Sequence, residues 1–225
     1  MMRLVTLLAA LFIALVTSCG GGGGQRSATL PDGATLLANS ATAMRAVTTT
    51  HFALAVQGNT SQVQVRSAEG ELTREGSAKG TAKLDEGSQL LELPFVVIGQ
   101  TLYLHLPTGP VQKLPAAALS MYFDPRSILD PDRGIAAVLA SGHGASTEAR
   151  EQVDGVDSYR LTVNFPAQLL TTLAPGLGLT TDKPSQIWIA AQGSRLVKAQ
   201  LPTTYGMITF QLSDFDAPVT ITPPA

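Results

Sequence analysis

The sequence is poor in cysteine, in charge and in aromatic side chains. Its one cysteine in 225 residues is Cys19, so the rest of the chain can form no internal disulfide bond and offers no cysteine nucleophile. Charged residues make up 14% of the chain, against about a quarter in typical soluble domains, and the formal net charge is −2. The sequence has no basic patch, so it gives no sign of a nucleic-acid partner. Hydrophobic residues reach 44% but aromatic ones only 5%, so a core must be built mainly from Ala, Val, Leu and Ile.

Histidine is scarce as well. His51, His105 and His143 show neither the His-x-x-x-His spacing of a helical metal site nor the His-x-His spacing of a strand. The chain also lacks the Gly-x-Ser-x-Gly elbow that positions a serine nucleophile. We therefore predict that this protein is not an enzyme and has no catalytic residues, no cofactor and no metal site. Among the functions considered, a secreted hydrolase is favoured least.

An acidic cluster in the middle of the chain suggests calcium, but its spacing argues against it. A calcium loop needs alternating oxygen ligands and a final glutamate, whereas prolines interrupt the pairs Asp124-Pro125 and Asp130-Pro131. An aspartate followed by proline is instead typical of a helix start, with the acid as N-cap. The neighbouring Asp132 and Arg133 fit either a local ion pair or a contact with a polar lipid headgroup.

The N-terminus has the pattern of an export signal. Arg3 precedes the apolar run Leu4–Val16, which is too short to span a bilayer. The residues that follow, Val16-Thr17-Ser18-Cys19, resemble the lipobox of bacterial lipoproteins, which implies cleavage before Cys19 and its diacylation. We expect a signal peptide at 1–18, a lipidated cysteine with a glycine-rich tether at 19–30, and a single domain at 31–225. The protein is then anchored by lipid to the extracytoplasmic face of the cell membrane.

Beyond the tether, the apolar residues change from a helical to an alternating period. Residues 31–47 have helical spacing, and so do shorter stretches within 115–141 and at 166–173. Most of the remainder alternates between apolar and polar residues, with short turns such as Asp154-Gly155 between the runs. Tight turns pair neighbouring strands antiparallel. The pattern predicts an α+β fold, in which a curved antiparallel sheet carries helices on its apolar face.

The same pattern leaves the state of the interior open. Small-residue helices over a face of Leu, Val and Phe either close tightly or leave a void. A packed core is compatible with a surface signalling or assembly lipoprotein that has a membrane protein as its partner. A void is compatible with a ligand-binding protein.

Three segments resemble one known family. Residues 123–135, FDPRSILDPDRGI, are similar to the DP-x-x-ILD-x-DRG stretch of the LppX/LprAFG lipoproteins of the mycobacterial cell envelope. Gln186–Ala190 looks like the late LWI strand of that family, and Asp214–Pro223 is similar to its APVTI-x-x-P terminus. Within the family, the chain resembles the LprF and LprA members more than LppX.

This resemblance implies a half-barrel sheet wrapped around helices that encloses an apolar cavity. The cavity of such a protein holds acyl chains of envelope lipids or lipoglycans and carries them between membrane and outer envelope. A multi-acyl lipid or glycolipid is therefore the expected ligand, and whether a membrane transporter or a sensor kinase is a further partner stays open. The candidate lining residues are Ile135, Val138, Leu139, Leu169, Leu170, Leu173, Leu102 and Leu104.

Overall fold

The computed structural model describes residues 29–58, 65–86, 89–119, 125–180, 183–204 and 206–224. The expected signal peptide, Cys19, most of the tether and the expected N-cap Asp124 lie outside these residues. Across the described ranges, no helix is long and apolar enough to cross a membrane.

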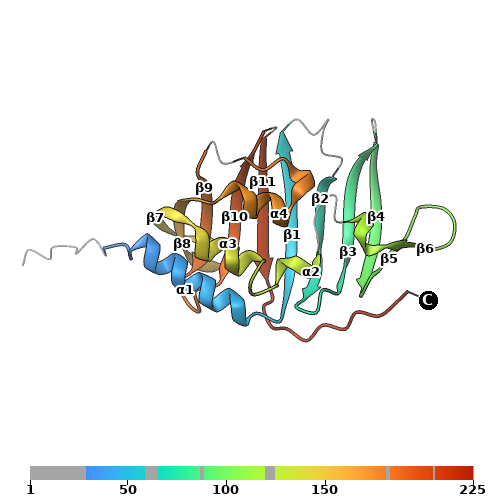
Figure 1. Cartoon of the computed structure of the whole chain (residues 1–225), viewed down its shortest axis with the longest axis horizontal. Helices are drawn as coiled ribbons and strands as arrows, with labels where there is room; N and C mark the ends of the chain where they lie inside the picture. Colours follow the sequence, from blue (N-terminus) through green and yellow to red (C-terminus); the bar gives the residue numbers. More distant parts are fainter. Residues whose placement is uncertain are drawn as a thin grey trace, which may run out of the picture.

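The fold is built on one sheet of eleven strands in which every neighbouring pair is antiparallel (Figure 1). The order across the sheet is β6-β5-β4-β3-β2-β1-β11-β10-β9-β8-β7, so the pairing of β1 with β11 joins the two halves of the chain. The strands are β1 (Thr49–Gly58), β2 (Val65–Thr73), β3 (Ala78–Glu86), β4 (Gln89–Ile98), β5 (Thr101–Leu104), β6 (Gln112–Pro115), β7 (His143–Val153), β8 (Val156–Asn164), β9 (Ser185–Ala190), β10 (Leu196–Thr203) and β11 (Gly206–Ser213).

The helices lie on one face of the curved sheet, which we call the concave face (Figure 1). They are α1 (Gly33–Ala46), α2 (Pro125–Ile128), α3 (Ile135–Ser141) and α4 (Ala167–Leu173), with 3-10 turns η1 (Ala116–Ala118) and η2 (Pro175–Leu177). The predicted α+β class, with helices on the apolar face of an antiparallel sheet, is confirmed.

Strand alternation follows the two environments of the sheet. In β1, Phe52 and Val56 are buried beneath the helices, whereas the alternate residues His51, Ala53 and Ala55 are half-buried on the convex face. A period of two is expected when one sheet face is covered and the other meets solvent.

Helix α1 begins where the sequence supplies a cap. Asp32 accepts hydrogen bonds at its Oδ1 atom from the main-chain N–H and the hydroxyl of Thr35, both at 2.8 Å. The helix buries the face that carries Leu36, Leu37 and Met44 against α3 and the sheet. A carboxylate cap satisfies one of the N–H groups left unpaired at a helix start.

The helix start expected at Asp130-Pro131 lies further along the chain, because α3 begins at Ile135. Asp130 caps a tight turn instead, because its Oδ1 accepts the N–H groups of Asp132 at 2.9 Å and Arg133 at 3.0 Å. Gly134 then takes the N-cap position in an extended conformation, and a Cβ there would lie 2.4 Å from the carbonyl oxygens of Ser127 and Ile128. Arg133 also forms its ion pair with Asp130, at 2.7 Å.

One end of the sheet is closed by polar bonds, and we call it the closed end. Arg74, in the turn between β2 and β3, donates from Nε to the carbonyl of Val47 at 3.0 Å and from Nη2 to that of Arg45 at 2.7 Å. The Arg45 carbonyl lies in the last turn of α1 and the Val47 carbonyl at its C-cap. Carbonyl groups at a helix end have no partner within the helix, and Arg74 supplies one. Residues 214–224 run along the same end, below the sheet in Figure 1.

Candidate functional site: an apolar cavity under the helices

A cavity with a volume of about 100 Å³ lies between the concave face and the helices. Every side chain that lines it is apolar. The sheet contributes Phe52, Leu54, Val65, Ala68, Leu72, Ile187, Leu196, Ala199, Leu201, Ile208 and Phe210, and the helices and linkers contribute Ile128, Ile135, Val138, Leu139, Phe165, Leu170, Leu173, Ala174, Leu177 and Leu179.

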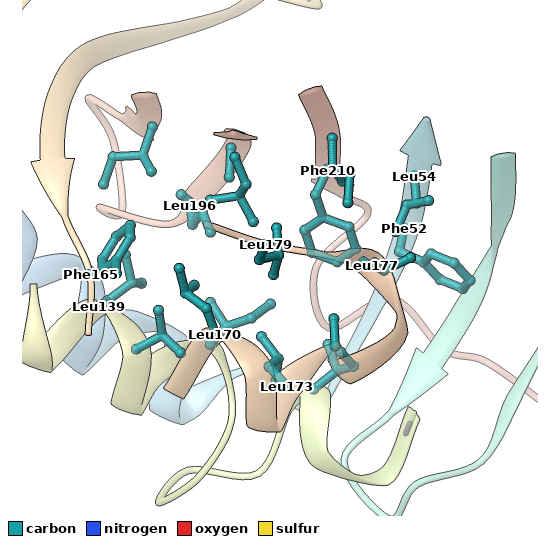
Figure 2. A pocket seen from close by; sticks show the side chains of 18 of the residues that line it. Phe52, Leu54, Leu139, Phe165, Leu170, Leu173, Leu177, Leu179, Leu196 and Phe210 are labelled. Carbon is teal, nitrogen blue, oxygen red and sulfur yellow. The ribbon is translucent and has the colours of Figure 1, made fainter. Parts of the chain in front are cut away.

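Side chains of α3 and α4 form the helical side of this cavity, which we call its roof. Ile135, Val138 and Leu139 occupy positions i, i+3 and i+4 of α3 and therefore share one face. Leu170 and Leu173 do the same on α4, and Figure 2 shows both side chains pointing into the space bounded by the strands. The roof is thus a set of leucine, isoleucine and valine side chains on short helices.

Five candidate residues from the sequence line this cavity: Ile135, Val138, Leu139, Leu170 and Leu173. The other three lie outside its lining. Leu102 is fully buried in the core of β5, and Leu104 and Leu169 pack against that core from its margin.

The reasons for these exceptions are positional. The cavity lining ends at β2, whereas β5 lies three strands further along the sheet, which removes Leu102 and Leu104 from it. Leu169 precedes Leu170 and so points about 100° away around the helix axis.

The sequence reasoning missed several lining residues, among them Phe52, Phe165, Leu177 and Phe210. Phe52 and Phe210 each stand in a run with a large apolar residue at every second position, which indicates that they lie on the apolar face of the sheet. This spacing does not show how far the helices stand from the sheet at Phe52 and Phe210. That distance depends on helices that are distant in the sequence.

The cavity can shelter hydrocarbon but cannot perform acid–base or metal chemistry. Its side chains carry no titratable group and no hydrogen-bonding atom. In the part of the chain that the structure describes, no three His, Cys, Asp or Glu side chains come together as a metal site. The Asp130 carboxyl has its pKa lowered mainly by a hydrogen bond from the Arg133 side chain, and this carboxyl lies outside the cavity.

Comparison with known proteins shows to which family the chain belongs. Residues 32–221 match the model of the LppX_LprAFG lipoprotein family. The chain belongs to this family. It is 35% identical over 216 residues to the lipoarabinomannan carrier protein LprG of Mycolicibacterium smegmatis, covering 94% of this chain and 91% of that protein. The LprG protein of Mycobacteroides abscessus is 38% identical over 205 residues, covering 87% and 86%.

Two crystal structures share the fold. LprF from Mycobacterium bovis aligns with a TM-score of 0.76 and 26% identity over 86% of this chain and 97% of that one. LppX from Mycobacterium tuberculosis aligns with a TM-score of 0.62 and 24% identity over 84% and 98%. The family resemblance read from three short segments is therefore confirmed, and the greater likeness to LprF than to LppX agrees with the expected order. The curated relatives carry the name LprG, which the sequence segments did not indicate.

Proposed function

We propose that this lipoprotein binds the acyl chains of an envelope lipid or lipoglycan in its apolar cavity and carries that lipid between the membrane and the outer envelope. The observation that carries the proposal is a cavity lined only by apolar side chains in a family whose curated relatives are named as carriers of lipoarabinomannan. The same relatives support a binding protein in preference to an enzyme.

The energetics favour an occupant. An empty apolar cavity costs about 24 cal/mol per Å³ in one measured series, so a cavity of about 100 Å³ destabilises the protein by roughly 2 kcal/mol. An acyl chain removes this cost and gains about 0.8 kcal/mol for each buried methylene. A lipid with long chains needs such a shelter to leave a membrane at a useful rate.

The roof must move to admit a whole chain, because an engineered apolar cavity of about 150 Å³ binds a ligand no larger in kind than benzene or xenon. Helix α4 is the element best suited to move. Its main-chain hydrogen bonds stay within its own segment, from Leu170 N–H to Pro166 at 3.4 Å and from Ala174 N–H to Leu170 at 3.1 Å. Beyond it, the chain is fastened again where Thr180 N–H donates to Pro202 at 3.1 Å.

The two ends of the sheet differ in what a lipid would meet. The closed end is held by the hydrogen bonds of Arg74 and by residues 214–224. The opposite end is covered by a second apolar cluster: Val56, Val65, Ala174, Leu177 and Ile208. We infer that acyl chains enter there, since apolar contacts can be exchanged for contacts with the ligand while broken polar bonds cannot.

Anchoring is a further part of the proposal. A diacylated Cys19 followed by Gly20–Gly24 would hold the domain at the membrane from which it loads. Glycine-rich linkers of about this length span on the order of 20 Å, so such a tether would keep the domain close to the membrane surface.

Lipid analysis of the purified protein tests the function. We expect protein purified without its lipid anchor to carry about one lipid per chain, identified by mass spectrometry after native purification. Protein that carries no lipid, and takes up none from vesicles of mycobacterial lipids, would contradict the carrier function and favour a signalling or assembly role.

A further inference from the structure

A row of four residues crosses the concave face beside the cavity. The strand registers align Phe52 with Gly70, Gly70 with Gly80, and Gly80 with Phe95. Residues directly opposite each other on neighbouring strands share a sheet face. Two phenylalanines therefore stand on either side of a pair of glycines.

Small residues continue above this row. In the next row, Leu54 aligns with Ala68, Ala68 with Ala82, and Ala82 with Leu93. The concave face of β2 and β3 is thus a trough floored by Ala68, Gly70, Gly80 and Ala82, with larger side chains on β1 and β4 as its walls. We call this the β2–β3 trough.

The sheet backbone fixes the depth of the trough. A Cβ built on Gly70 would lie 2.1 Å from the carbonyl oxygen of Lys79, and one on Gly80 would lie 2.0 Å from that of Glu69. No real Cβ contact is this short, so neither strand accepts a larger residue at this point without moving. The trough is also not sealed, because Gly80 and Ala82 are half-buried although Phe52 and Phe95 beside them are buried.

Phe52 lies where the cavity meets the β2–β3 trough. In Figure 2 its ring is turned toward β2, whereas the Phe210 ring lies over the cavity between the strands and α4. Phe52 lines the cavity, and the lining includes Ala68 and Leu72 of β2 but no described residue of β3, β4 or β5. The cavity therefore reaches the β2 side of the trough, at Ala68, but not its β3 side.

We propose that Phe52 limits the length of acyl chain that this protein accepts, by closing the cavity off from the β3 side of the β2–β3 trough. The proposal rests on the proposed lipid-binding function and names the residue that sets its selectivity. Without the ring, a chain could run on across β2 and β3. Since the cavity already reaches β2, the step from β2 to β3 would add one strand spacing, about 5 Å, to the length of the site.

A competition between chain lengths tests this role. Wild-type protein, Phe52→Ala and Phe52→Leu are incubated with vesicles of saturated phosphatidylglycerols that differ only in acyl-chain length, and the bound lipids are measured by mass spectrometry. We expect Phe52→Ala to shift the bound lipids to longer chains, with a rise of about fourfold for each additional methylene sheltered. Phe52→Leu should shift the bound lipids to longer chains by a smaller amount. If the alanine variant does not fold, the leucine variant still tests the role of Phe52.

Phe95→Ala is the matched control. It removes the same ring from the same row and neighbours the same glycine pair, but Phe95 does not line the cavity. It should leave the wild-type chain-length distribution unchanged. An equal shift in Phe95→Ala would mean that any loosening of the sheet lengthens the site, and this would overturn the role of Phe52.

The two proposals fail in different ways. Wild-type protein that binds none of these phosphatidylglycerols and no mycobacterial lipid would defeat the carrier function, and the role of Phe52 with it. Wild-type and Phe52 variants that bind equal total lipid with identical chain lengths would defeat the role of Phe52 alone.

Discussion

Asp216 accepts a hydrogen bond at Oδ1 from the main-chain N–H of Thr48 at 2.8 Å, across 168 positions of sequence. The Thr48 hydroxyl donates to the same oxygen at 3.0 Å, and Arg195 forms an ion pair with the carboxylate. These bonds fasten the segment after β11 to the residues that lead into β1. They lie at the closed end, so they help to keep that end shut while the opposite end is free to open.

Acid should weaken this contact. The pKa of the Asp216 carboxyl is lowered from its ordinary value of 3.8, mainly by the hydrogen bond from the Thr48 N–H. A carboxyl whose pKa is lower in the folded than in the unfolded state stabilises the fold above the unfolded value, and this stabilisation is lost as pH falls through the folded value. We expect Asp216→Asn to unfold at lower urea concentration than wild type at neutral pH, and the difference to shrink below about pH 4.

Urea titrations at several pH values check this. The exposed Asp132→Asn removes one negative charge elsewhere and serves as the control. A constant difference between wild type and Asp216→Asn from neutral to acid pH would show that the charge of Asp216 does not contribute.

Alanine substitutions at two glycines with positive φ distinguish the cost of a strained backbone from the cost of a steric clash. Gly70 has φ +157° and an added Cβ would collide with Lys79, whereas Gly99 has φ +59° and no atom within 4 Å of an added Cβ. We expect Gly99→Ala to cost about 1–2 kcal/mol, from the backbone conformation alone. Gly70→Ala should cost clearly more, or prevent folding, because β2 and β3 must also separate.

Thermal and urea unfolding of the two variants gives the comparison. Equal losses of stability would mean that the strands adjust freely at Gly70. The trough floor would then be softer than its geometry indicates.

Much of the sheet could be predicted because each strand meets two environments. The spacing of Phe52 and Val56, or of Leu161 and Val163, reports which side chains face inward, and that information is local. Strand β7 escaped prediction because this edge strand, HGASTEAREQV, is exposed or half-buried along nearly all of its length and carries no alternation of large apolar residues. The short strand β6 was not predicted either, since its four exposed residues carry no period at all.

The cavity was harder to locate than the sheet. Its lining depends on how far the roof stands from each row of strands, which is decided by contacts between distant segments. Helix spacing identified Val138 and Leu170 because they share a face with other apolar residues. Nothing local distinguishes Leu102, which the core buries, from Phe52, which borders the cavity.

Cys19→Ala tests the anchor. The variant should move from the membrane to the soluble fraction and keep the melting temperature of the wild-type domain, because the glycine tether separates the anchor from α1. Cell fractionation followed by blotting makes the measurement. A variant that stays with the membrane after a salt wash would show that something other than an acylated Cys19 holds the protein there.

The final prediction distinguishes a cavity from a packed core by adding volume. Val138 lines the cavity from α3, whereas Val97 on β4 is fully buried and lies outside the lining. In a packed interior, a valine replaced by tryptophan must overfill its site, at a typical cost of 1–3 kcal/mol or more. We expect Val97→Trp to show this loss.

In Val138→Trp the indole would occupy space that the ligand otherwise fills. The variant should therefore stay folded, with a free energy of unfolding near that of lipid-free wild type. It should also co-purify with much less lipid. Urea unfolding and mass spectrometry of bound lipid measure the two effects separately. Equal destabilisation of both variants would favour a packed core, and a folded Val138→Trp with its full lipid load would show that the ligand does not pass beneath α3.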